Sequence, residues 1–204
     1  MLGITDYTTF VVTVLVFLLV PGPGNLALIT STSKGGIKGG LAATLGVILG
    51  DQVLMWSAVA GVATLLMAYP DAFHAVQWLG AAYLGWLGFK MLLAKPGTAP
   101  VINIKPHHFL QQAMMITLCN PKAILIYMAF FPLFVDPVHL QGLLTYVFMA
   151  ATIAVLTLGY GLTSTLLPHF LTERVRANPL VSRVLEKATG LFLIGFGIKR
   201  AVSR

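Results

Sequence analysis

Residues 20–25 read Val-Pro-Gly-Pro-Gly-Asn and interrupt an apolar run that extends from Tyr7 to Ile29. The run is long enough for a membrane-spanning helix, which needs roughly 20 apolar residues. Proline and glycine are the poorest helix formers, and here two of each fall inside the run rather than at its end. A backbone break in the middle of a hydrophobic segment is therefore the feature that the rest of the chain has to explain.

The composition around this break is that of an integral membrane protein. Of 204 residues, 57% are hydrophobic and 9% are charged, and the mean hydropathy is +0.88, whereas soluble domains carry about 25% charged residues. The alternating pattern of membrane β-strands is missing from the sequence. We therefore predict an all-α polytopic fold with a single transmembrane domain, residues 1–204, and six spans at residues 7–31, 39–67, 73–94, 109–135, 141–168 and 185–202.

The residue composition and the positions of the charged residues, histidines and cysteine argue against several classes of partner. The basic residues are spread over loops without interleaved aromatic residues, so no nucleic-acid partner is predicted. The histidines form no pattern typical of metal ligands, and the single Cys119 excludes an internal disulfide. We predict no metal and no cofactor. The first segment has no basic leader and carries Asp6, so we expect it to be retained rather than cleaved.

The charges of the loops predict an orientation. Three loops share the basic residues, whereas the loops around residues 69–71 and 136–137 hold none. The positive-inside rule makes the basic set cytoplasmic and both termini outward. The basic residues of the C-terminal end oppose this assignment. The cytoplasmic set comprises Lys34, Lys38, Lys90, Lys95, Lys105, Arg174, Arg176, Arg183 and Lys187, and the opposing set Lys199, Arg200 and Arg204.

Two halves of the chain are similar in pattern. Residues 80–90 and 190–199 both contain paired glycines followed by Gly-x-Lys, and the first and fourth spans both contain an internal proline followed by aliphatic residues. Halves of about 1–95 and 106–204 would each have three spans, which places the second half inverted relative to the first. The pattern predicts a 3+3 inverted repeat with broken helices in the first and fourth spans, a plan that many secondary transporters use. The alternative is that glycine and lysine are simply common at such positions.

The first break frees backbone acceptors in the hydrocarbon region. Pro21 lacks the N–H that would bond to the carbonyl of Phe17, and Pro23 leaves the carbonyl of Leu19 free. An unsatisfied backbone group costs several kcal/mol in lipid, so such a break survives only inside protein or beside a watery cavity. Freed carbonyls would suit an ammonium group.

The residues that follow would suit the opposite charge. Gly22 and Gly24 let the chain bend and let a ligand approach the backbone. Asn25 is predicted to be the N-cap of a second half-helix that starts at Leu26, and the N–H groups and dipole of that helix favour an anion. Together the two sides of the break match a zwitterionic amino acid. The alternative is an ordinary proline kink packed against its neighbours.

The fourth span contains a similar break. Pro121 would free the carbonyl of Thr117 and is flanked by Asn120 and Lys122. Because paired interruptions in corresponding spans point to a substrate site near the midplane, we predict a substrate-binding site formed by both breaks. Its residues are Pro21, Gly22, Pro23, Gly24, Asn25, Asn120, Pro121 and Lys122.

Asp51 is the only carboxylate in the interior of a predicted span, since Glu186 is the second residue of the sixth span and lies at its end. A charge at the bilayer centre costs about 2.5–3.5 kcal/mol on insertion scales, so it usually pairs, lines water or holds a proton. We predict a proton-coupling role for Asp51, with a structural ion pair to Lys122 as the alternative. Before it, the small residues Ala42, Gly46 and Gly50 recur every four positions, which favours close packing of helices.

These motifs resemble the LysE/RhtB family of amino-acid exporters and look most like its leucine-exporter branch. The similarity to the family rests on Val20-Pro21-Gly22-Pro23 with Asn25, on Gly50-Asp51, and on Asn120-Pro121-Lys122-Ala123. The similarity to the branch rests on the stretch from residues 46–51 through residues 60–65. The resemblance implies export of amino acids from the bacterial cytoplasm, driven by the proton motive force. We therefore predict an inner-membrane exporter of neutral amino acids such as leucine, threonine or homoserine, which works by alternating access with proton antiport.

Other readings of the chain stay open at this point. A membrane-embedded enzyme acting on a lipid or phosphate substrate would need a cluster of polar residues at one surface, and Arg174-x-Arg176 is the nearest candidate. A non-transporting assembly subunit would leave the two breaks and Asp51 without a purpose. The expected partners are an amino-acid substrate, protons and the lipid bilayer. The sequence decides neither which amino acid is exported, nor the coupling stoichiometry, nor the oligomeric state, of which a homodimer is one option.

Overall fold

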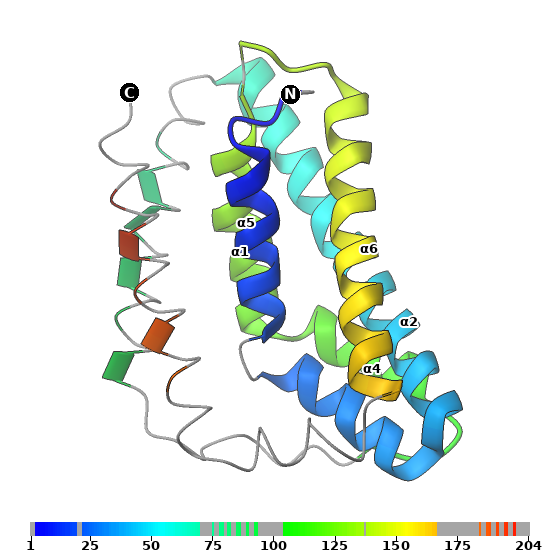
Figure 1. The fold of residues 1–204 in the computed structure, drawn as a ribbon. Coiled ribbons are helices and arrows are strands. Elements are labelled where there is room, and N and C mark those ends of the chain that lie inside the picture. Colours follow the sequence, from blue (N-terminus) through cyan, green and yellow to red (C-terminus); the bar gives the residue numbers. More distant parts are fainter. Residues whose placement is uncertain are drawn as a thin grey trace.

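The computed structural model describes residues 3–19, 22–69, 104–136 and 138–166, together with scattered single positions between 75 and 93 and between 184 and 198. Within these residues the protein is all-α, as predicted, and contains no strand. The helices are α1 (Tyr7–Leu19), α2 (Pro23–Ala68), α4 (Phe109–Leu118), α5 (Pro121–Phe134) and α6 (Leu143–Leu166), and α1, α5 and α6 run side by side (Figure 1).

The first predicted span is broken at the position that its proline and glycine residues predicted. α1 ends at Leu19, and the helix resumes at Pro23, whose first turn is closed by a hydrogen bond from the Leu26 N–H to the Gly22 carbonyl at 3.0 Å. The residues of α2 do not form one continuous rod, because Gly36 has φ 59 and ψ −153. Such dihedrals are essentially restricted to glycine. Gly36 therefore divides α2 into a short arm, residues 23–35, and a long arm, residues 37–68.

The fourth predicted span is also interrupted. α4 and α5 meet at Cys119 and Asn120 with an angle of 56° between them. The Cys119 N–H bonds the carbonyl of Met115 at 2.9 Å and so ends α4, and Asn120 then caps α5 by accepting the Lys122 N–H on its Oδ1 at 3.1 Å. Pro121 occupies the first helical position, where a missing N–H costs nothing.

Within the described residues, two helical segments are long and apolar enough to cross a membrane, namely Pro23–Gly61 and α6, and a third qualifies if α4 and α5 count as one bent span. The predicted third and sixth spans, 73–94 and 185–202, fall largely outside the described residues. The six-span arrangement and the inverted repeat therefore stay predictions.

Small residues let α2 approach its neighbours closely. A Cβ added to Gly46 would collide with the backbone carbonyl of Leu110 in α4, and one added to Gly50 would meet the side chain of Thr117. Gly161 of α6 similarly faces Thr44 of α2. The small-residue stripe is thus a packing surface between helices.

A short segment before α1 closes one end of the bundle. Ile4 pairs antiparallel with Val135, the Thr5 N–H bonds the Phe134 carbonyl at 3.1 Å, and the Asp136 N–H bonds the Gly3 carbonyl at 3.0 Å. We call residues 3–6 the N-terminal strap. It lies at the end of the bundle where the chain passes from α5 to α6 (Figure 1).

Candidate functional site

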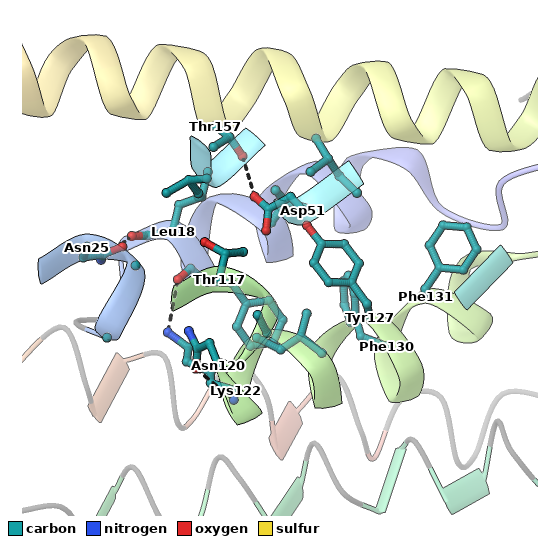
Figure 2. Close-up of a pocket in the computed structure, with 18 of the residues that line it drawn as sticks. Leu18, Asn25, Asp51, Thr117, Asn120, Lys122, Tyr127, Phe130, Phe131 and Thr157 are labelled. Carbon is teal, nitrogen blue, oxygen red and sulfur yellow. Dashed lines mark hydrogen bonds between the residues drawn. The ribbon is translucent and has the colours of Figure 1, made fainter. Parts of the chain in front are cut away.

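A cavity of about 100 Å³ lies where the two helix breaks meet. This volume has room for several water molecules or one small ligand. Its wall combines parts of the five helices that the described residues form, and Figure 2 shows polar side chains from α2, α4, α5 and α6 directed into one region. The wall comprises Phe10, Val14, Phe17, Leu18, Gly22, Gly24, Asn25, Val47, Asp51, Thr117, Asn120, Lys122, Ala123, Ile126, Tyr127, Phe130, Phe131, Ile153 and Thr157.

The first break contributes three of the predicted site residues to this wall: Gly22, Gly24 and Asn25. The predicted N-cap role of Asn25 is wrong, because the second half-helix begins at Pro23 and Asn25 lies within its first turn. The Asn25 Nδ2 instead donates to the Leu18 carbonyl at 2.9 Å and so links the two half-helices across the break. Pro21 lies outside the described residues.

The freed carbonyls at the break take their donors from the protein itself. The Phe17 carbonyl, which the sequence predicted to be released by Pro21, accepts a hydrogen bond from the Lys122 Nζ at 3.4 Å. The Thr117 carbonyl, predicted to be free at the second break, accepts the Asn120 N–H at 3.1 Å. The break is thus where predicted, but the sequence did not reveal that Lys122 and Asn25 would supply its donors.

The second break contributes Asn120 and Lys122 to the cavity wall. Asn120 is buried and performs the capping role that the sequence had assigned to Asn25. The first turn of α5 directs N–H groups and the positive end of the helix dipole toward this region. When protonated, the Lys122 side chain adds a positive charge to this part of the cavity wall. Pro23 and Pro121 begin α2 and α5 respectively, and neither is among the residues that line the cavity.

The opposite charge comes from Asp51 in the long arm of α2, which is 8% exposed. The Tyr127 hydroxyl of α5 hydrogen-bonds the Asp51 carboxylate, and the Thr157 Oγ1 of α6 donates to its Oδ2 at 3.4 Å. Figure 2 shows Asp51 between these two side chains. The partners of Asp51 are therefore two hydroxyls rather than the ion pair with Lys122 that the sequence suggested as an alternative.

Apart from Thr117, whose hydroxyl donates to the Ala113 carbonyl at 3.0 Å, the remainder of the wall is apolar. α1 contributes Phe10, Val14 and Phe17, and α5 contributes Ile126, Phe130 and Phe131. A ligand in the cavity would thus meet a positive side, a carboxylate and an aromatic and aliphatic surface. Among the described residues, no group of three or more His, Cys, Asp or Glu side chains is placed to bind a metal ion.

Two polar residues of the cavity wall, Tyr127 and Thr157, were not predicted from the sequence. Tyr127 lies five residues after Lys122 and shares a helix face with Ala123 and Phe130, so the spacing of three and four residues could have identified it. Thr157 gave no comparable signal, because α6 contains several threonines and only the packing of the helix selects the one that faces Asp51.

Comparison with known proteins gives a consistent result. The LysE type translocator family profile matches residues 15–204. Leucine efflux proteins from Salmonella choleraesuis and Klebsiella pneumoniae are each 34% identical to the chain over 203 residues, covering 98% of this chain and 96% of theirs. An uncharacterized membrane protein of Pseudomonas aeruginosa is 34% identical over 210 residues, covering 99% of this chain and 97% of the relative. No solved structure matches.

Proposed function

Because the chain belongs to the LysE type translocator family, and is thus a membrane transporter rather than an enzyme, we propose that it exports a neutral amino acid across the bacterial inner membrane. The observation that carries the proposal is the cavity at the two helix breaks, where Lys122 and Asp51 line a largely apolar space. A neutral amino acid needs a counter-charge for each of its charged ends and an apolar surface for its side chain.

The substrates favoured are leucine, threonine and homoserine. Leucine is supported by the names of the relatives from Salmonella and Klebsiella. Phe10, Val14 and Ile153 of the cavity wall suit an aliphatic side chain.

We infer that export works by alternating access within a six-span, 3+3 inverted repeat whose termini are periplasmic. In this scheme the two breaks form a midplane site that faces each side of the membrane in turn. Asp51 carries the coupled proton, which enters from the acidic periplasmic side and leaves to the cytoplasm. The burial of Asp51 among helices supports this role, because an ionisable group at such a position marks ion and substrate pathways.

Uptake into inverted membrane vesicles tests the proposal. With the vesicle lumen acidified, labelled leucine, threonine or homoserine should accumulate inside, and an ionophore that collapses the pH gradient should abolish the accumulation. Asp51→Asn should remove the effect of the gradient. Accumulation equal to that of vesicles without the protein would contradict the export function, and unchanged gradient-driven uptake by Asp51→Asn would contradict the coupling role alone.

A further inference from the structure

The cavity contains a carboxylate whose hydrogen bonds do not use its full capacity. An ionised carboxylate offers about four acceptor positions, and Asp51 receives two described hydrogen bonds, from Tyr127 and Thr157. Both donors reach Asp51 from other helices, so they fix the direction in which the remaining acceptor positions face. Asp51 itself lines the cavity.

The alternative acceptors for a substrate ammonium already have donors. The Phe17 carbonyl accepts the Lys122 Nζ, and the Leu18 carbonyl accepts the Asn25 Nδ2. An ammonium group that entered the cavity would lose its hydration and would need an anion or several carbonyls in exchange. Among the described residues of the wall, Asp51 is the only carboxylate.

We propose that Asp51 binds the substrate ammonium directly, so that substrate and proton compete for one carboxylate. This inference rests on the proposed function and adds to it the means of coupling. A carboxylate that holds a proton no longer offers its charge to an ammonium, and one that binds the ammonium is not protonated at the same time. Exchange of the proton for the substrate ammonium then takes place at the Asp51 carboxylate itself. Coupling needs no second proton-binding group and no separate pathway to it.

The orientation of the substrate follows from the same geometry. With its ammonium on Asp51, the substrate would direct its carboxylate toward Lys122 and the first turn of α5, and its side chain toward Val14, Phe130 and Ile153. Tyr127 and Thr157 then act as positioning residues for Asp51. Besides Asp51, the titratable groups in the described cavity wall are Tyr127, which hydrogen-bonds Asp51, and Lys122, which bonds the Phe17 carbonyl. Both come from α5, whereas the described wall residues of α1, α4 and α6 include none.

Proton release on binding tests the competition. Leucine, with threonine and homoserine in parallel, is added to the purified protein in weakly buffered detergent solution that contains a pH indicator. Below the pH at which Asp51 loses its proton, binding should release about one proton per leucine, and the Kd should rise roughly tenfold per unit of acidification. The hydroxy-acid analogue 2-hydroxy-4-methylpentanoate keeps the carboxylate and side chain of leucine but lacks the ammonium. Its binding should release no proton.

Three variants identify the group responsible. Asp51→Asn should abolish the proton release and weaken leucine binding at least about tenfold. Lys122→Met should weaken binding but keep the release per leucine bound. Asp136→Asn, the same chemical change outside the cavity, should match the wild type in both measurements.

Two results would overturn the competition while leaving export intact: a pH-independent Kd for leucine without proton release in the wild type, or proton release that persists in Asp51→Asn. If the wild type binds none of the three amino acids, the proposed function fails together with this inference. The wild-type titration and the analogue need no variant, so the test is decisive even where Asp51→Asn does not fold.

Discussion

Asn25 shows how one amide can bridge a broken membrane helix. Its Nδ2 donates to the Leu18 carbonyl, which belongs to the half-helix on the other side of the break. The bond therefore spans the gap that the prolines create. Its role is to hold the two half-helices in a defined relation, and the cavity that both of them line depends on that relation.

Replacing Asn25 should lower stability in an order set by this bond. Asn25→Ala loses a membrane hydrogen bond and should cost on the order of 1 kcal/mol. Asn25→Asp should be worse, because it places a carboxylate oxygen beside the Leu18 carbonyl with no donor between them. Thermal unfolding in detergent, followed by size-exclusion chromatography of the heated samples, measures both. An Asn25→Asp variant as stable as the wild type would contradict the assignment.

The roles of individual residues were the part of the structure that the sequence predicted least well. Both breaks have an asparagine within two residues of a proline. The local pattern predicted a cap at Asn25, whereas the cap forms at Asn120. The choice depends on where each half-helix begins, which the rest of the fold decides. The predicted release of the Phe17 carbonyl gave no indication that Lys122, distant in sequence, would bind it.

At the scale of elements, the sequence was more informative. The broken first span, the turn after it and the interrupted fourth span lie within a few residues of their predicted positions, because proline and glycine act locally on the backbone. The rotation of each helix about its axis was not predictable, since every face of an apolar span has similar hydrophobicity. Tyr127 and Thr157 escaped notice for this reason.

The contact between α2 and α4 gives a prediction with a control in the same helix. Gly46→Ala would drive a methyl group into the backbone of Leu110, so the helices must separate, at a cost of about 1–3 kcal/mol. Gly61→Ala should be neutral or stabilising by up to about 1 kcal/mol, because no atom of the described residues lies within 4 Å of the added Cβ and alanine favours helix.

Thermal unfolding of the two glycine variants in detergent distinguishes the two effects. The difference between them, rather than either value alone, measures the closeness of the α2–α4 contact. Equal stability of Gly46→Ala and Gly61→Ala would show that α4 does not approach α2 as described.

At the scale of the whole molecule, the N-terminal strap and the aromatic residues beneath it form one layer. Ile4 and Val135 pack in a single buried cluster with Phe10, Phe131 and Phe134. Phe10 and Phe131 also line the cavity. Between the cavity and this end of the bundle, the described structure is therefore filled by side chains and covered by paired backbone.

We expect the strap to act as a gate at this end of the bundle, where the Ile4–Val135 pairing joins it to the end of α5. For a substrate to leave by this end, which the charge pattern predicts to be periplasmic, the Ile4–Val135 pairing must separate. A disulfide between Ile4→Cys and Val135→Cys, made in a Cys119→Ser background, should stop vesicle uptake of leucine when oxidised, and a reductant should restore it. Each single cysteine variant should be insensitive to oxidation. Full uptake by the completely cross-linked protein would mean that the exit lies elsewhere, and that the strap stays attached to the end of α5 throughout the transport cycle.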